Sequence, residues 1–200
     1  MKYKARLIIT AVAVTALAGL SGCDLISSYF RAQKAAVKWE GPIEEIASAD
    51  LTKDGKVFTI SMVSRIDLPP DKVWEAMKHP EKLAQNSESY KKSDILKDEG
   101  NHKELEIHVM ALDSLQQLTV SMDFDDAAKT LHIKTLTSTI ADIDGVYSLS
   151  ASPDGTKSLY TYTAKQTDKV ALPISEDVQR SAIKESFVNQ VRAIKKQAAS

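Results

Sequence analysis

Hydrophobic and polar residues alternate along several stretches of this chain, and each stretch predicts a β-strand. Between residues 56 and 66, Phe58, Ile60 and Met62 alternate with mostly polar neighbours, which is typical of a strand with one buried face. The same period of two recurs at 104–111, 118–124, 131–135, 143–149 and 160–164. Turn-forming residues such as Asp, Asn and Gly fall between several of these stretches, which predicts an antiparallel meander.

Apolar residues at helical spacing predict helices before and after these strands. A short helix is expected at 70–78, because it begins at a proline and ends before Pro80, and a second short turn at 81–86. A long amphipathic helix follows Ser175, which is a favourable N-cap residue. Its apolar stripe consists of Ile183, Phe187, Val191 and Ile194. One strand, two short helices, about six strands and a long helix indicate an α+β fold.

The N-terminus combines positive charge, an uncharged apolar run and a cysteine. Three positive residues among the first six precede Leu7–Leu20, a run that is shorter than the ~20 residues needed to span a bilayer and is typical of a secretory signal. The next residues, Leu20-Ser21-Gly22-Cys23, resemble the bacterial lipobox. The resemblance implies that 1–22 is a signal peptide, removed between Gly22 and Cys23, and that Cys23 carries a diacylglycerol.

Lipidation at Cys23 predicts a membrane partner and a cell-envelope location. Asp24 resembles an inner-membrane retention signal, which favours the periplasmic side of the inner membrane over the outer membrane. Residues 23–50 are expected to form a tether, with a possible short helix at 43–49, ahead of a domain at 51–200. Three aromatic residues of this tether can lie at the bilayer interface or pack on the domain: Tyr29, Phe30 and Trp39.

Composition limits the remaining functions. Cys23 is the only cysteine, so an intramolecular disulfide is impossible and no thiol remains for nucleophilic catalysis. Without 1–22, the 178 remaining residues hold 23 of the 26 Lys and Arg against 27 Asp and Glu, a net charge of −4. This balance argues against a nucleic-acid partner. The length fits one domain with a tether, and we expect a monomer.

The segment from Ile66 to Leu83 reads Ile-Asp-Leu-Pro-Pro-Asp-Lys-Val-Trp-Glu-Ala-Met-Lys-His-Pro-Glu-Lys-Leu. It resembles the START-like superfamily, also called Bet v 1-like or polyketide cyclase/dehydrase-type (SRPBCC), although His79 stands where Asp is commoner. Residues 144–147 and 156–162 resemble the later paired strands of this family, and the order of elements matches over 54–198. The resemblance implies a helix-grip fold, with a curved antiparallel sheet wrapped around the long C-terminal helix.

The same resemblance implies an apolar cavity between sheet and helix, and therefore a hydrophobic ligand such as a lipid, sterol, isoprenoid or polyketide. The tyrosines on the concave face can orient such a ligand through their hydroxyls or serve as ordinary core aromatics. The candidate cavity residues are Val120, Met122, Phe124, Ile133, Tyr147, Tyr160, Tyr162, Phe187 and Val191.

The sequence contains no strong motif for metal binding or catalysis. His102, Glu104, Glu106 and His108 share one strand face, but a strand spreads them by ~6.5–7 Å per step, which predicts a solvated face and no metal site. The sequence has no nucleophile elbow, phosphate-binding glycine loop or dinucleotide fingerprint, so we assign no catalytic residue and no cofactor.

Two alternatives to ligand binding stay open. The first is an enzyme of cyclase, dehydratase or hydrolase type acting on an aromatic or polyketide-like substrate. The second is a protein-interaction lipoprotein with a vestigial cavity.

Overall fold

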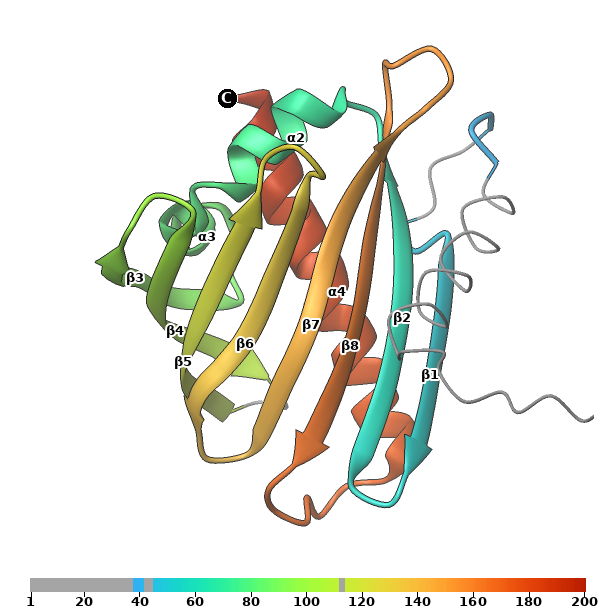
Figure 1. The fold of residues 1–200 in the computed structure, drawn as a ribbon. Helices are drawn as coiled ribbons and strands as arrows, with labels where there is room; N and C mark the ends of the chain where they lie inside the picture. The colour runs from blue at the N-terminus through green and yellow to red at the C-terminus, as the bar shows by residue number, and fades with distance from the viewer. Residues whose placement is uncertain (1–37, 42–44, 112–113) are drawn as a thin grey trace, which may run out of the picture. The chain divides into compact units, whose positions relative to one another are not determined.

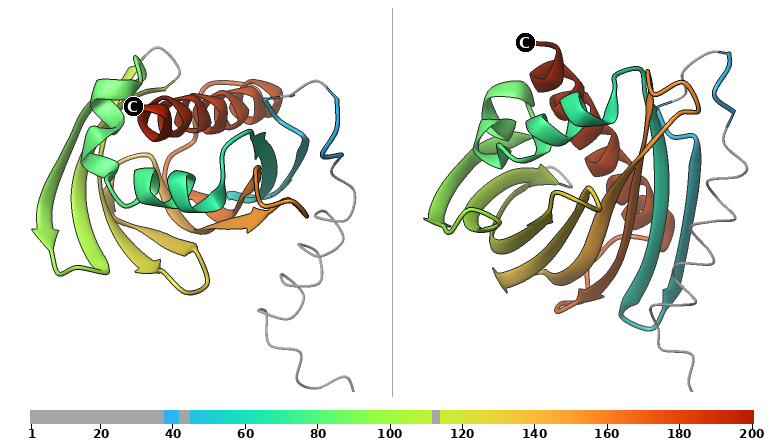
Figure 2. Two further views of the ribbon diagram at one scale, coloured as in Figure 1. Left: turned by 90° about the horizontal axis from the view of Figure 1, so that it is seen from above. Right: turned by 45° about the horizontal axis from the view of Figure 1, so that its top comes forward.

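The computed structural model describes residues 38–41, 45–111 and 114–200. These residues lie in one compact unit, Val37–Ser200. An antiparallel sheet of eight strands curves around one long helix, α4 (Glu176–Ala199), as Figures 1 and 2 show. The α+β helix-grip fold predicted from the sequence is therefore confirmed.

The sheet has the spatial order β1-β2-β8-β7-β6-β5-β4-β3. The chain crosses from β2 to the far edge through α2 (Pro70–Met77), η1 (Pro80–Lys82) and α3 (Leu83–Asn86), and then returns strand by strand until β8 pairs with β2. The strands are β1 (Ser48–Asp54), β2 (Val57–Ile66), β3 (Tyr90–Asp98), β4 (His102–Ala111), β5 (Ser114–Asp125), β6 (Thr130–Ser138), β7 (Ala141–Ala151) and β8 (Ser158–Asp168).

Two strands lie outside the predicted stretches, and both are edges of the sheet. β1 begins at Ser48, within the segment that the sequence analysis treats as tether. Ser48 and Ala49 pair with Val63 and Met62, so the possible short helix at 43–49 is wrong in this part. β3 is exposed along most of its length and lacks regular alternation, which explains why the pattern of hydrophobic residues does not reveal it.

Strand β2 differs from its prediction because both of its faces are buried towards the C-terminal end. The concave face holds Ile60 and Met62, as expected, but Val63 and Arg65 on the opposite face are also buried. The Arg65 guanidinium donates hydrogen bonds to backbone carbonyls of residues 38–41, which cover this part of the strand. The prediction of a single buried face therefore holds only for residues 57–60, because Ser61 on the opposite face is also buried.

The helices begin and end where local chemistry favours it. Pro70 is the first residue of α2, a position that needs no N–H partner. Trp74 of α2 is buried, and its indole N–H donates to Asp126 Oδ1 at 2.6 Å, which fixes α2 over one end of the sheet. At the start of α4, the Ser175 hydroxyl accepts a hydrogen bond from the Val178 N–H at 3.3 Å, as the predicted N-cap requires.

Candidate functional site

An apolar cavity of about 220 Å³ lies between α4 and the concave face of the sheet. Strands β2 and β4 to β8 supply most of its wall, and α4 lies across the curved sheet (Figure 2). The aliphatic lining residues are Ile60, Met62, Leu83, Ile107, Val109, Ala111, Leu118, Val120, Met122, Ile133, Ile140, Ala141, Ile143, Leu172, Ala182 and Ile183. A wall of this composition favours an apolar occupant.

Six of the nine candidate residues line this cavity: Val120, Met122, Ile133, Tyr147, Tyr162 and Phe187. The other three are buried in the core beside it. Phe124 packs edge-on against Trp74 of α2, with ring centroids 6.0 Å apart. Tyr160 lies between the rings of Tyr147 and Phe187, and Val191 is buried one turn further along α4.

The aromatic side chains form one stacked cluster in the wall. The Tyr147 and Tyr162 rings lie 4.3 Å apart between centroids with planes at 14°, and Tyr160 stacks on Tyr147 at 5.4 Å. Phe187 of α4 stacks on Tyr160 at 5.7 Å and closes the cluster from the helix side. The cluster therefore joins β7, β8 and α4 through a continuous aromatic surface.

Several polar lining residues were not among the sequence candidates: Tyr90, Gln116, Ser138, Gln166, Gln179, Ser186 and Gln190. Helical spacing could have found Gln179 and Gln190, because they share a face of α4 with Ile183 and Phe187. Strand parity could likewise have found Gln116, which shares a face with Val120. Tyr90 had no such signal, because it opens the unpredicted strand β3.

Tyr147 lies close to one of these polar groups and to a second tyrosine. Its hydroxyl interacts with the side chains of Gln190 and Tyr162. Burial raises the pKa of Tyr90 to about 12, and it also raises the pKa of Tyr147 and Tyr162 well above their ordinary value. The three phenols are therefore neutral at physiological pH and act as hydrogen-bonding groups.

Among the described residues that line the cavity, none carries a charge. A nearby cation is Lys53, which contacts the lining residue Gln179 from outside. Its Nζ donates to Gln179 Oε1 at 2.7 Å and to Asp168 Oδ2 at 3.1 Å, and it lies 4.4 Å from the centre of the Phe58 ring. The charge of Lys53 is thus paired by a carboxylate and shielded from the cavity.

The cavity opens beside the first half of α4. Ser186 lines it and is exposed, and Ala182 and Ile183 on the same helix are half-buried. Across the opening, Ala111 and Gln116 at the adjoining ends of β4 and β5 are also half-buried lining residues. These residues of α4, β4 and β5 are points at which the described cavity wall reaches the surface.

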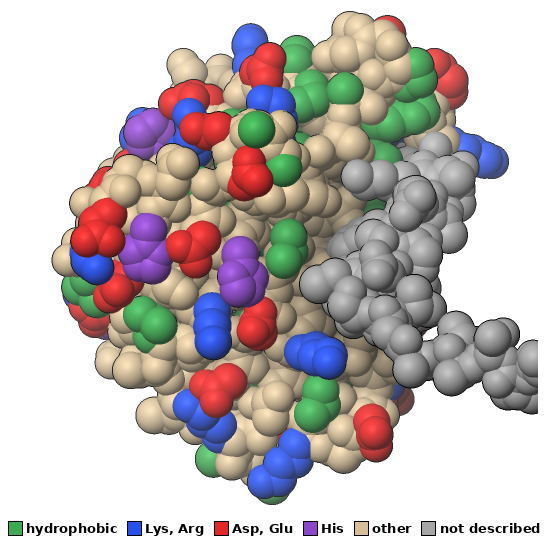
Figure 3. Space-filling view, viewed as in Figure 1, with side chains coloured by type: hydrophobic (Ala, Val, Ile, Leu, Met, Phe, Trp, Pro, Cys, Tyr) green, Lys and Arg blue, Asp and Glu red, His purple; other side chains and the backbone are tan. Residues whose placement is uncertain are grey.

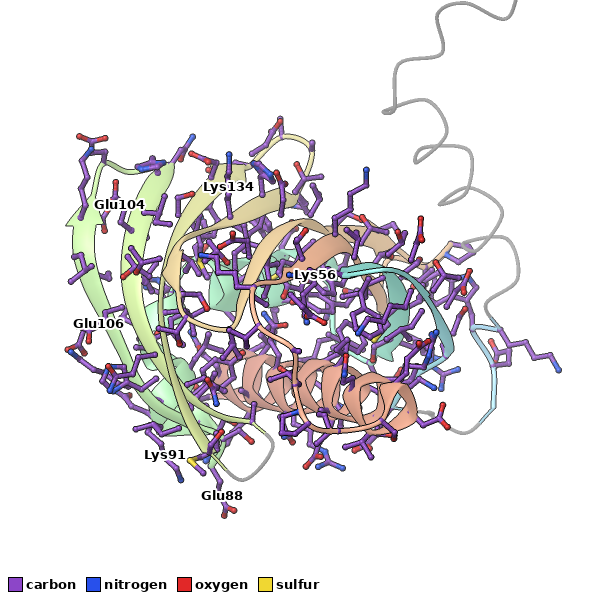
Figure 4. All side chains as sticks on the ribbon, turned by 90° about the horizontal axis from the view of Figure 1, so that it is seen from below. Lys56, Glu88, Lys91, Glu104, Glu106 and Lys134 are labelled. Carbon is purple, nitrogen blue, oxygen red and sulfur yellow. The ribbon has the colours of Figure 1, made fainter. Side chains whose placement is uncertain are left out.

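The convex face of the sheet carries many charged residues. Figure 3 shows acidic, basic and histidine side chains mixed across this face, and Figure 4 shows Glu104, Glu106 and Lys134 on the outer side of the sheet, away from α4. His102 Nδ1 lies 2.6 Å from Asp123 Oδ1, and His108 Nε2 lies 2.7 Å from Glu106 Oε1. No group of three metal-ligating side chains occurs among the described residues.

The N-terminal predictions fall mostly on residues outside the described ranges, including residues 1–22, Cys23, Asp24, Tyr29 and Phe30. Trp39 is described, and it is half-buried with its carbonyl accepting hydrogen bonds from Arg65 and Lys157. In the described ranges, no helix has the length and apolar character to cross a membrane.

Solved structures with this fold include proteins of several kinds. The Zhui aromatase/cyclase from Streptomyces sp. R1128 superposes with a TM-score of 0.64 at 17% identity, over 72% of this chain and 94% of that one. A START superfamily protein from Mycobacterium smegmatis gives 0.58 at 11% identity, over 70% and 97%. A STAR-related lipid transfer protein from Xanthomonas axonopodis gives 0.56 at 13% identity, over 76% and 99%.

No protein-family model matches the chain, and no curated protein matches it. At these identities the structural likeness establishes the START-like (Bet v 1-like, SRPBCC) fold and nothing about activity.

Proposed function

We propose that this chain is a lipid-anchored cell-envelope protein whose START-like domain binds a hydrophobic small molecule. The observation that carries the proposal is the cavity of about 220 Å³ between α4 and the sheet, which has an opening to solvent and an apolar wall. Binding of an apolar molecule in such a cavity removes both the ligand and the wall from water. The lipid transfer protein among the similar structures is consistent with this function.

The anchoring part of the proposal rests on the N-terminal sequence. The charged start, the apolar run Leu7–Leu20 and the motif ending at Cys23 occur in the order and spacing of a lipoprotein precursor. Two or three acyl chains on Cys23 are enough for stable attachment to a bilayer. With Asp24 as the next residue, we place the protein on the periplasmic side of the inner membrane.

Binding is favoured over catalysis by the chemistry of the wall. General acid–base catalysis is most efficient when the catalytic group has a pKa near the operating pH. Among the described lining residues, the only titratable groups are the phenols of Tyr90, Tyr147 and Tyr162, and burial raises the pKa of each. These phenols are poor general bases at neutral pH, and no carboxylate, imidazole or amine is among the described lining residues.

A cavity-filling variant tests the proposal. The full chain is purified, and binding of the neutral dye N-phenylnaphthylamine is followed by fluorescence. Ala182→Trp places an indole in the cavity, whereas Ser181→Trp adds the same group at an exposed neighbouring position outside it. We expect wild type and Ser181→Trp to bind the dye and Ala182→Trp to bind at least about tenfold more weakly. Equal binding by Ala182→Trp and wild type, or no binding by either, would exclude the cavity as a ligand site.

A further inference from the structure

The polar groups of the cavity are neutral, and several meet at Tyr147. Its hydroxyl interacts with Gln190 on α4 and with Tyr162 on β8, and all three side chains line the cavity. Phenols and amides can each donate a hydrogen bond to an oxygen atom and accept one from a hydroxyl. A ligand oxygen at this point therefore finds hydrogen-bonding partners without a counter-charge.

Tyr160 adds an unused polar group beside them. Its side chain is fully buried, and its hydroxyl has no hydrogen-bond partner within the described part of the chain. The hydroxyl interacts electrostatically with those of Tyr90 and Tyr162, two residues of the cavity wall. Buried hydroxyl groups normally have a partner, so the core beside the wall holds one unpaired hydrogen-bonding group.

An ion would find no compensation in the same place. The Lys53 ammonium is already paired with Asp168, and none of the described residues that line the cavity carries a charge. Transfer of an isolated charge from water to an apolar site is much less favourable than transfer of a neutral polar group that gains a hydrogen bond. The wall therefore discriminates between neutral and ionised molecules of the same shape.

We propose that the cavity selects an uncharged, mainly apolar molecule with one ketone or hydroxyl oxygen, which binds at the Tyr147–Tyr162–Gln190 cluster. This inference rests on the proposed binding function and narrows its ligand class. A cavity of about 150 Å³ holds benzene, so the 220 Å³ here suits a rigid core of about ten non-hydrogen atoms. The rings of Tyr147 and Tyr162 line the cavity and offer aromatic contacts to such a core.

Three ligands of nearly equal shape test whether the cavity selects against charge and whether it favours a neutral oxygen atom. They are methyl naphthyl ketone, naphthoate and isopropylnaphthalene. The ketone is neutral with one acceptor oxygen, naphthoate is ionised at pH 7, and the hydrocarbon has no polar atom. Their affinities for the full chain are measured by displacement of N-phenylnaphthylamine. Each is also measured with the double variant Tyr147→Phe/Gln190→Leu and with Ala182→Trp. The double variant removes two of the three hydrogen-bonding groups of the cluster and keeps the aromatic ring at 147.

We expect the ketone to bind wild type about tenfold more tightly than either naphthoate or the hydrocarbon. In the double variant the ketone should lose this advantage over the hydrocarbon, while the affinity of the hydrocarbon stays within about twofold. Naphthoate binding as tightly as the ketone would overturn the selection against charge, and a hydrocarbon equal to the ketone would overturn the role of the polar cluster. Both of these results leave the binding function intact, whereas failure of all three ligands, or binding unaffected by Ala182→Trp, would refute the binding function itself.

Discussion

The rings of Tyr147 and Tyr162 stack in the cavity wall, with their centroids 4.3 Å apart and their planes inclined by 14°. The two residues are cross-strand partners on β7 and β8, so the register of the sheet itself brings the rings together. Gln190 of α4 interacts with the hydroxyl of Tyr147. One pair of residues therefore connects strand pairing, the helix contact and the polar end of the cavity.

A double-mutant cycle measures what this stacking contributes. Tyr147→Leu and Tyr162→Leu each remove one ring, and the coupling between the two substitutions should be about 1 kcal/mol in the free energy of unfolding, the usual range for aromatic pairs. Urea denaturation of the four proteins gives this value. Tyr147→Leu combined with Phe124→Leu is the matched control, because Phe124 packs on Trp74 instead, and its coupling should be close to zero. Equal couplings in the two cycles would show that the stacking has no specific role.

Gly145 lies two residues before Tyr147, at a point where the wall has no room for a side chain. A Cβ atom at Gly145 would lie 2.7 Å from the Cβ of Ala164 and 3.0 Å from the carbonyl oxygen of Thr163. Gly145→Ala should therefore lower the free energy of unfolding by roughly 1–3 kcal/mol, the cost of overpacking a close contact. Ala164→Gly in the same chain removes the shorter contact and should restore part of the loss. Thermal unfolding of the single and double variants checks both expectations, and an unchanged Gly145→Ala midpoint would refute the close approach.

The fold was largely predictable because most strands have one face against the core. Alternation located β2 and β4 to β8, and the proline and serine at helix starts located α2 and α4. The edge strands β1 and β3 were not predicted, because much of their side-chain surface is exposed and polar residues are therefore tolerated on either face. Pairing with β2, as between Leu51 and Ile60, is what orders β1, and this partner is not visible in the local sequence.

The site was only partly predictable from the sequence. Alternation along a strand shows which face of the sheet a residue occupies, but not whether that part of the face borders the cavity or is covered by a helix. Met122 and Phe124 share a face of β5, yet Met122 lines the cavity while Phe124 is covered by Trp74. The position at which α2 meets the sheet decides between the two, and it depends on tertiary packing. The polar lining residue Gln190 was overlooked for a related reason, because a buried glutamine interrupts the apolar stripe that the sequence analysis followed.

Arg65 should control the attachment of residues 38–41 to the domain. Its buried guanidinium donates to the carbonyl oxygens of Lys38 at 3.1 Å, Trp39 at 3.0 Å and Gly41 at 2.7 Å. Arg65→Met removes all three hydrogen bonds and should lower the free energy of unfolding by about 2 kcal/mol. It should also accelerate trypsin cleavage after Lys38, which mass spectrometry of the products can follow.

Two further variants distinguish the geometry of Arg65 from its charge. Arg65→Lys keeps a positive charge, but one ammonium group cannot reach all three carbonyls. Trypsin cleavage after Lys38 should therefore be about as fast in Arg65→Lys as in Arg65→Met. Lys157→Met removes the single hydrogen bond from Lys157 to Trp39 and should have a smaller effect than Arg65→Met. Unchanged cleavage after Lys38 in Arg65→Met would contradict the proposed attachment.

His102 on the convex face should titrate at an unusually high pH for an imidazole. Its Nδ1 lies 2.6 Å from Asp123 Oδ1, and this hydrogen bond raises the pKa of His102 above the ordinary 6.5. Because the charged form gains the partner, the stabilisation is fully present below about pH 6.5 and is lost as the pH rises through the raised pKa. Asp123→Asn should return the His102 pKa towards 6.5 in an NMR titration of its ring protons. Identical titration curves for the two proteins would contradict the pairing.

Cys23→Ser tests the proposed lipid anchor at the atom on which it depends. In a lipoprotein precursor a diacylglyceryl group is transferred to the cysteine sulfur, and the signal peptidase acts on the modified chain. The serine hydroxyl is a far weaker nucleophile, so the precursor should keep residues 1–22 or be released in soluble form after another cut. The domain should still fold, because the described helices and strands begin at Ser48. Metabolic labelling with a palmitate analogue and detergent phase partitioning compare Cys23→Ser with wild type and with Ser27→Ala, a matched control outside the motif. The label should be lost in Cys23→Ser alone, and a Cys23→Ser variant that takes up the label and partitions like wild type would refute the lipobox.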